Sequence, residues 1–98
     1  MKTLHLVLKH KWYDKIASGE KTSEYRACTP YWNRRFTGDK DSTRVHLRQF
    51  VYDKVVFHKG YTKETMCFEL KSIRLLENQP NDLNADKCWE IKLGERLK

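Results

Sequence analysis

The stretch that decides the fold is GEKTSEYR, residues 19–26. Extended backbone over residues 21–26 would place Glu24 and Arg26 on one face of a strand and Lys21 and Tyr25 on the other. Neither face is apolar, whereas a strand inside an ordinary core needs at least one apolar face. We therefore predict an edge strand or a strand that lines a polar cavity.

The residues before this stretch predict one strand and one helix. Leu4, Leu6 and Leu8 alternate with His5 and Val7, which is typical of a strand with one face in the core. Trp12 and Ile16 are four residues apart, which predicts a short helix from about Lys11 to Ser18. Gly19 follows, where the left-handed end of a helix favours glycine.

The residues after the stretch predict a helical turn and further strands. Pro30–Phe36 is expected to form one helical turn with Pro30 at its first position. Alternation of apolar and polar residues predicts strands around 55–57, 66–70 and 89–93, with a turn at 59–61 and loops at 37–43 and 77–87. The first two of these strands, with the turn between them, have the pattern of a β-hairpin.

These elements predict the fold class. A chain of 98 residues makes one domain, residues 1–98, because it can bury only one modest core. We predict an α+β fold of about five to six short strands with a helix after strand one. Such strands commonly close into a small mixed β-barrel, because closure removes exposed sheet edges.

Four positions of the opening stretch resemble the signature of the ASCH family, G-x-K-x-x-E-x-R, namely Gly19, Lys21, Glu24 and Arg26. The resemblance extends to the early leucine strand, to Trp12-Tyr13 in the helix, to Pro30-Tyr31-Trp32 with Arg35, and to Phe57-x-x-Gly60-Tyr61. It covers nearly the whole chain. It implies a PUA-like barrel in which the motif lines a polar cleft beside the first helix, and RNA or a nucleotide as the ligand.

The chemistry of Lys21, Glu24 and Arg26 suits such a ligand. A buried glutamate between two cations stays ionised and orients them as hydrogen-bond donors toward a phosphate or a base edge. Arginine offers a planar fork, whereas a partly buried lysine near it can act as a base or nucleophile. The alternative is a Glu24–Arg26 ion pair on a solvated sheet surface, which would have little consequence.

The charge of the chain also points to a polyanionic partner. The net charge is +7, and residues 1–60 contain thirteen basic and six acidic residues, while residues 61–98 contain seven of each. A basic surface attracts nucleic acid by releasing its counterions. A solvated basic face that keeps the protein soluble is the alternative.

Aromatic and basic residues interleave after the motif, an arrangement that can hold single strands by stacking and phosphate contacts. Trp32 and Phe50, like Trp12 and Trp89, are expected in the core. The predicted ligand-binding residues are Lys21, Glu24, Arg26, Tyr31, Arg34, Arg35, Arg44 and Arg48.

Three functions remain open. The first is an RNA-binding domain. The second is an enzyme acting on RNA or a modified nucleoside, similar to the ribonuclease or acylcytidine amidohydrolase branches of the family, with Lys21 and Glu24 as catalytic residues. A threonine stands in place of Glu24 in the amidohydrolase branch, which argues against deacylation, and Glu69 would be a possible second carboxylate. The third is a protein-interaction domain, for which no residue argues specifically.

Metal, cofactor and membrane binding have no support in the sequence. The candidate ligands are Cys28, Cys67, Cys88, His5, His10, His46 and His58. None has the close spacing of a zinc or redox site, so no metal or cofactor is predicted and the thiols are expected to be reduced. The chain shows no export signal and no apolar run of membrane length, so we expect a cytoplasmic protein.

Overall fold

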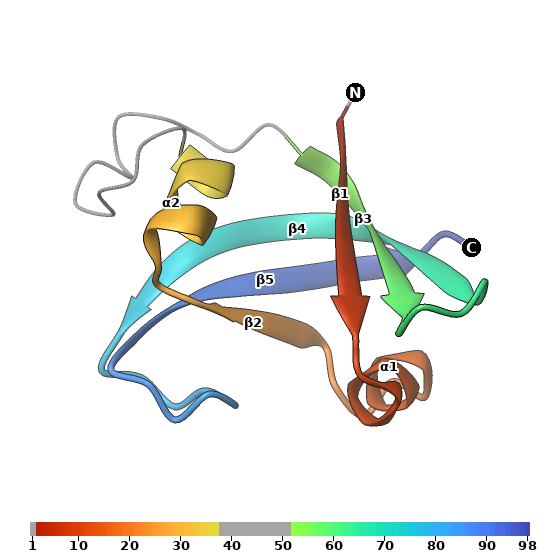
Figure 1. Ribbon diagram of the computed structural model, residues 1–98, viewed down its shortest axis with the longest axis horizontal. Helices are drawn as coiled ribbons and strands as arrows, with labels where there is room; N and C mark the ends of the chain where they lie inside the picture. The colour runs from red at the N-terminus through yellow and green to blue at the C-terminus, as the bar shows by residue number, and fades with distance from the viewer. Residues whose placement is uncertain (1, 38–51) are drawn as a thin grey trace. The chain divides into compact units, whose positions relative to one another are not determined.

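The computed structural model describes residues 2–37 and 52–98, which contain five strands and two helices (Figure 1). The elements are β1 (Lys2–Leu8), α1 (His10–Ala17), β2 (Ser23–Ala27), α2 (Pro30–Thr37), β3 (Tyr52–Lys59), β4 (Thr65–Glu77) and β5 (Lys87–Arg96). The strands form one sheet in the order β1-β3-β4-β5-β2. β1 runs parallel to β3, and β3 runs antiparallel to β4. The predicted α+β class, with a mixed sheet and a helix after strand one, is confirmed.

The chain groups into two compact units. Unit 1 comprises Met1–Ser23, Tyr52–Lys71 and Lys92–Lys98, and unit 2 comprises Glu24–Val51 and Ser72–Ile91. β4 and β5 contribute residues to both units. Each unit has its own buried side chains.

The core of unit 1 follows from the alternation along β1. Leu4 and Leu6 are buried, and the parallel register sets them against Val55 and Phe57 of β3, which are buried too. Because side chains alternate between the two faces of a strand, this register keeps the apolar residues of both strands together on the inner face. Once β1 and β3 are neighbours, the alternation therefore excludes a shift of the register by one residue.

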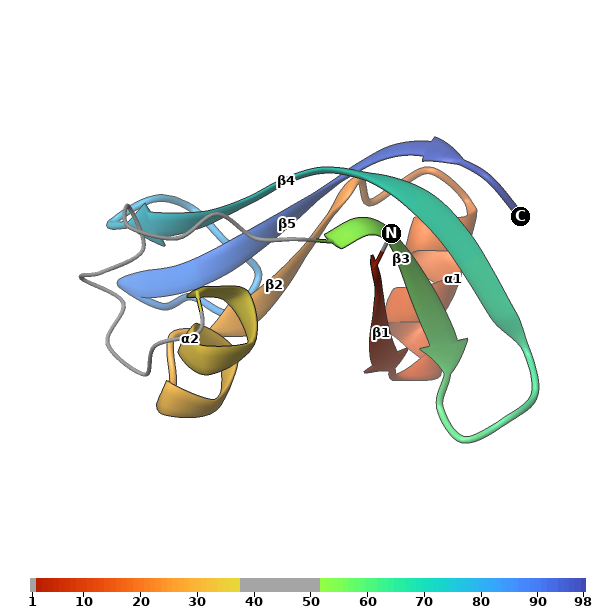
Figure 2. The ribbon, with the colours of Figure 1, turned by 90° about the horizontal axis from the view of Figure 1, so that it is seen from above.

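Helix α1 lies beside the carboxyl end of β1 in both views (Figures 1 and 2). It buries Tyr13 and Ile16, which lie close to one face because they are three residues apart. Gly19 has a φ of +83°, the left-handed conformation predicted for the residue that ends the helix. The backbone N–H of Lys21 then donates to the carbonyl of Lys15 at 3.0 Å, which ties the first residues of the motif to the helix.

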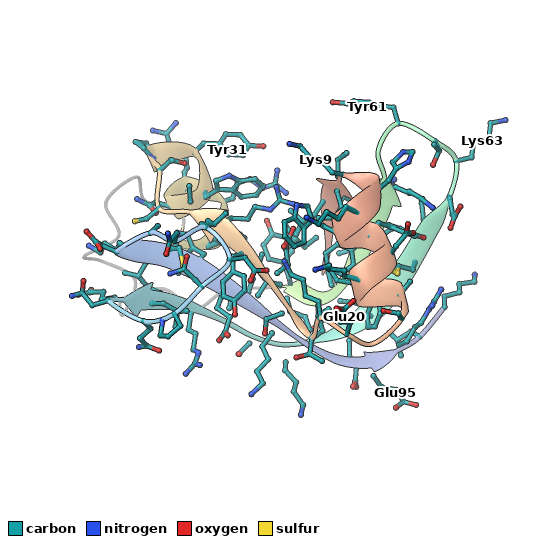
Figure 3. The ribbon with its side chains drawn as sticks, turned by 90° about the horizontal axis from the view of Figure 1, so that it is seen from below. Lys9, Glu20, Tyr31, Tyr61, Lys63 and Glu95 are labelled. Atoms are coloured by element: carbon teal, nitrogen blue, oxygen red, sulfur yellow. The ribbon has the colours of Figure 1, made fainter. Side chains whose placement is uncertain are left out.

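The predicted hairpin between β3 and β4 is confirmed. Gly60 lies in the turn with a φ of +54°, and its N–H donates to the carbonyl of Leu8 at 2.8 Å. The next residue, Tyr61, is 99% exposed and points away from the strands (Figure 3). The turn is thus anchored by its backbone and not by its aromatic side chain.

The core of unit 2 forms between α2 and β5. Trp89 is buried, and its indole N–H donates to the Asn33 side-chain oxygen at 2.9 Å. Phe36, one turn further along α2, meets the Trp89 ring edge-on with 5.3 Å between centroids. A polar residue can therefore lie in this core, because the tryptophan nitrogen supplies the hydrogen bond that a buried amide needs.

Helix α2 is longer than the single predicted turn. It has eight residues, and Thr29 caps its start: the Trp32 N–H donates to the Thr29 hydroxyl at 3.4 Å, and the Asn33 N–H donates to the Thr29 carbonyl at 2.8 Å. Neither of the two helices in the described residues is long and apolar enough to cross a membrane.

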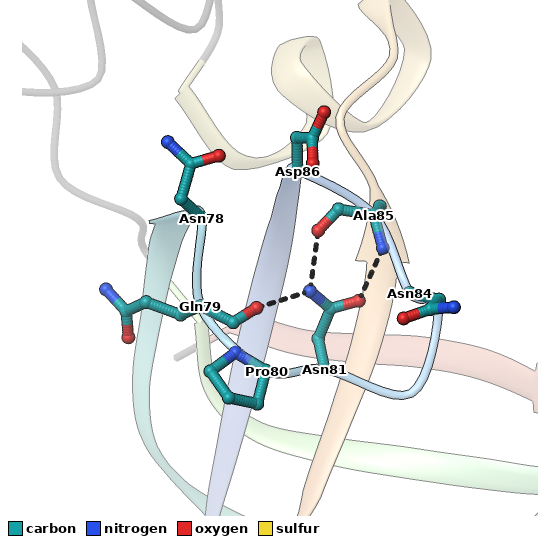
Figure 4. Close-up of a pocket in the computed structure, with 7 residues that line it drawn as sticks. All are labelled: Asn78, Gln79, Pro80, Asn81, Asn84, Ala85 and Asp86. Carbon is teal, nitrogen blue, oxygen red and sulfur yellow. Dashed lines mark hydrogen bonds between the residues drawn. The ribbon is translucent and has the colours of Figure 1, made fainter.

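The predicted loop between β4 and β5 is confirmed and is organised by one side chain (Figure 4). The Asn81 amide donates to the carbonyls of Gln79 and Ala85, both at 2.8 Å. Its oxygen accepts from the N–H groups of Leu83 and Ala85. The polar groups that line this loop are therefore used largely in the loop's own hydrogen bonds.

Candidate functional site

The motif residues Glu24 and Arg26 form an ion pair in unit 2. Glu24 is only 6% exposed, and its Oε2 accepts from Nη2 of Arg26 at 3.1 Å. Its Oε1 accepts from the backbone N–H of Tyr25 at 3.1 Å. Both oxygens of the carboxylate are thus engaged, as expected of a group that orients a cation and does not itself react.

Arg26 is also held from a second direction. Its guanidinium carbon lies 5.2 Å from the centroid of the Trp32 ring, which is within cation–π range. The arginine side chain is 21% exposed, so the fork is partly covered yet reaches solvent. Trp32 is half-buried, and the expectation that it belongs to the core is wrong. Asn33 and Phe36 are the residues of α2 that enter the core. The Trp32 ring instead contacts two arginines.

The second arginine is Arg35, which with Tyr31 extends this surface along α2. The two lie four residues apart, so they are neighbours on the helix, and Nη1 of Arg35 donates to the Tyr31 hydroxyl at 3.0 Å. The Arg35 guanidinium also lies 5.7 Å from the Trp32 ring centroid. Tyr31 is 59% exposed and projects from the helix in Figure 3.

A surface hollow of about 460 Å³ accompanies these residues, lined by Pro30, Tyr31, Arg34 and Arg35. We call Arg26, Tyr31, Trp32, Arg34 and Arg35 the arginine–aromatic cluster. It combines three guanidinium groups with two rings. Such a surface suits a ligand that has both negative charge and flat aromatic faces.

A second buried carboxylate, Glu90 of β5, was missed by the sequence analysis. Its Oε1 accepts from Nε of Arg74 at 2.8 Å, and its Oε2 accepts from the Tyr25 hydroxyl at 3.5 Å. Glu90 alternates with apolar neighbours, which predicts a solvent-facing side chain. No signal in the sequence distinguishes it from such a residue, because its burial depends on Tyr25, which is 65 residues away.

Lys21, the remaining cation of the motif, lies in unit 1 beside Trp12. Its Nζ is 4.6 Å from the centroid of the Trp12 ring, and those of Lys11 and Lys15 are 5.1 and 5.4 Å away. We call these four residues the lysine–tryptophan cluster. Trp12 is half-buried, so its predicted core position is wrong: the lysine side chains cover the ring in place of apolar neighbours.

Two of the predicted ligand-binding residues, Arg44 and Arg48, lie outside the described residues, as does Phe50. Glu69, considered as a second carboxylate, is exposed, and its Oε1 accepts from the Glu95 N–H at 3.2 Å. Residues 2–37 and 52–98 contain no group of three or more side chains that could together hold a metal ion.

Cys88 is fully buried, and burial raises the pKa of its thiol above the ordinary value of 9.0, with a smaller contribution from Glu90. Cys28 and Cys67 are half-buried. Since the thiolate is the reactive form, Cys88 should react last. We expect iodoacetamide at pH 8 to label Cys28 and Cys67 first and Cys88 only after unfolding in urea, as measured by peptide mass spectrometry.

The same pKa shift has a consequence for stability. As the pH rises through 9.0, Cys88 ionises more readily in the unfolded chain than in the folded one, so stability present below pH 9 is lost above it. A Cys88→Ser control should reduce this alkaline loss. Labelling of native Cys88 as fast as Cys67 would contradict the prediction.

The structure thus brings Glu24, Arg26, Tyr31, Arg34 and Arg35 into one unit, four of them in the arginine–aromatic cluster with the fifth, Glu24, fixing Arg26. Lys21 belongs to the other unit. Comparisons with family models, with curated proteins and with solved structures found no match to the chain.

Proposed function

We propose that this chain is an RNA-binding ASCH domain with a PUA-like barrel, and that the arginine–aromatic cluster is where RNA binds. The observation that carries the proposal is the position of Arg26, paired with buried Glu24 and lying over the Trp32 ring. The motif resemblance supports the family, and the confirmed α+β class with a mixed sheet is compatible with it.

Arg26 is suited to a phosphate or a base edge. A guanidinium presents its N–H donors in one plane, so it can form two parallel hydrogen bonds to either group. Glu24 and Trp32 restrict that plane before any ligand arrives. A side chain ordered in advance loses less conformational entropy on binding, and this strengthens the complex.

Tyr31 is suited to stack on a base. Its ring is exposed, and its hydroxyl accepts the hydrogen bond from Arg35, which limits the ring's motion. The adjoining hollow, at about 460 Å³, is within the roughly 300–1,000 Å³ of small-ligand sites. Stacking requires an unpaired base, so single-stranded RNA is favoured over a duplex.

The net charge of +7 and the lysine–tryptophan cluster support binding to the phosphate backbone. Three ammonium groups near one ring repel one another, and a phosphate between them would relieve that repulsion. Such contacts add affinity without sequence preference. Binding is therefore expected to weaken as salt is raised.

The test measures fluorescence anisotropy of a labelled single-stranded RNA of mixed sequence, across a salt series, with the wild type and four variants. Arg26→Ala and Arg96→Ala remove the same charge, but Arg96 is exposed and lies outside the cluster. We expect Arg26→Ala to lose about tenfold or more in affinity and Arg96→Ala much less. Arg26→Lys keeps a cation near Glu24 and should lose nearly as much, since it lacks the fork.

Circular dichroism of each variant controls for folding, and Arg26→Lys keeps the test informative if Arg26→Ala unfolds. Equal losses in Arg26→Ala and Arg96→Ala would show that only total charge matters and would contradict the cluster. Wild-type protein that leaves RNA unbound at low salt would contradict RNA binding itself. If the wild type shortens the RNA and Lys21→Ala does not, the protein is a ribonuclease and not a binding domain alone.

A further inference from the structure

Two histidines that are 53 residues apart in sequence meet on the sheet of unit 1. Nδ1 of His5 on β1 and Nε2 of His58 on β3 are 3.1 Å apart. The ring centroids are 5.3 Å apart, with 38° between the ring planes. Both side chains reach the surface, since His5 is exposed and His58 is half-buried.

The strands that hold the two rings are fixed by the core beneath them. The parallel register places His5 opposite Val56 and His58 opposite Val7. The residues on either side of each histidine point inward; among them Leu4, Leu6 and Phe57 are buried. The backbone of both histidines is therefore held in place by the core, and the two imidazoles can separate only by rotation of their side chains.

The spacing of the two nitrogens matches that of two ligands on one metal ion. Imidazole nitrogens bind zinc at about 2.0–2.1 Å. For two nitrogens 3.1 Å apart, this bond length gives an N–metal–N angle of about 98°. This angle lies between the roughly 90° of square-planar and the roughly 109° of tetrahedral coordination. Small rotations of the two side chains would turn their lone pairs toward a common ion.

We propose that His5 and His58 form a surface site for a divalent late first-row transition metal, with Cu²⁺ bound most tightly and Zn²⁺ and Ni²⁺ more weakly. Neutral imidazole is a preferred ligand of these ions, and their affinities follow the Irving–Williams order. One of the two rings now donates an N–H to the other. To bind the metal through that same nitrogen, this ring must change tautomer, and its proton then lies on its other ring nitrogen. No net proton leaves a neutral pair.

Water would complete the coordination, because the described residues offer no third side-chain ligand at this place. On the face of β3 that carries His58, the charged residue nearest to the pair is Lys54. It lies two positions before Val56 and opposite Thr3 in the register. Its charge lowers the affinity for a cation but does not block the pair. The site shares no residue with the arginine–aromatic cluster, so the proposed metal binding does not depend on the proposed RNA binding.

The experiment titrates the full chain, without an affinity tag, with Cu²⁺ and follows binding by calorimetry and by electron paramagnetic resonance. We expect one tight Cu²⁺ per chain, with hyperfine splitting from two nitrogens. His5→Gln and His58→Gln should each lose about tenfold or more in affinity, because the second imidazole binds at high effective concentration once the first has bound. His10→Gln, which removes an exposed histidine of α1, should leave the affinity unchanged.

A second measurement does not depend on variants. In NMR spectra of the imidazole nitrogens, Zn²⁺ added to the wild type should shift the signals of His5 and His58 and leave that of His10 in place. Zn²⁺ should also raise the thermal midpoint of the wild type, since it binds the folded pair. Three results would overturn the proposal: no Cu²⁺ binding by the wild type, wild-type affinity in the His5→Gln and His58→Gln variants, or an equal loss of affinity in His10→Gln.

Discussion

Replacing Trp89 with alanine is expected to lower the free energy of unfolding by about 3–5 kcal/mol. Trp89 is 1% exposed and joins the two sides of the unit 2 core. The substitution removes the edge-on contact with Phe36 and the hydrogen bond to Asn33 at once. Since small domains have about 5–15 kcal/mol of stability in total, the variant should be close to unfolding at room temperature.

Trp89→Phe separates the two contributions. Phenylalanine keeps most of the contact with Phe36 but cannot donate to Asn33, which is itself buried. The remaining loss should be about 1–3 kcal/mol, the cost of weakening the hydrogen bonding of a buried amide. Urea unfolding followed by circular dichroism measures both variants without relying on tryptophan fluorescence. A cost for Trp89→Ala below that of Trp89→Phe would contradict this account of the core.

Replacing Glu24 with alanine should cost about 3 kcal/mol of stability and should also weaken RNA binding. The substitution leaves the largely covered Arg26 guanidinium without its buried carboxylate, and breaking such a pair costs more than the pair contributes. Arg26 remains cationic, so the loss of RNA affinity would come from its position and not from charge. Glu24→Gln keeps a hydrogen-bond acceptor and should lose less of both.

A double-mutant cycle tests the pairing directly. Glu24→Ala combined with Arg26→Ala should cost clearly less than the sum of the two single variants, because no lone buried charge remains. Thermal and urea unfolding give the stabilities, and anisotropy with labelled RNA gives the affinities. Additive losses would mean that Glu24 and Arg26 contribute separately, and the role assigned to Glu24 would then be wrong.

Much of the fold could be predicted because its signals are local. Alternation along β1 and β5, the four-residue spacing in α1 and the glycine at position 19 each depend on residues a few positions apart. The chain needs no distant partner to express these preferences. The closed barrel and the ASCH family remain predictions, the first from the set of short strands and from the resemblance, the second from the resemblance alone.

The errors concern what covers a side chain, which the spacing of residues along the chain does not determine. Trp12 and Trp32 have the spacing of core residues, yet lysines cover one ring and arginines the other. Glu90 has the spacing of a surface residue, yet it is buried beside Tyr25. Periodicity shows which residues share a face but not what lies against that face.

The sequence by itself determined the positions of α1 and of the strands, and the spacing that places Glu24 beside Arg26 on β2, since these depend on neighbouring residues. Only the tertiary structure decided that Arg26 lies over the Trp32 ring and that His5 meets His58. The histidine contact requires the parallel pairing of β1 with β3, whose hydrogen bonds join residues about 50 positions apart. No local pattern encodes such a pairing, because it forms only when the core brings the two strands together.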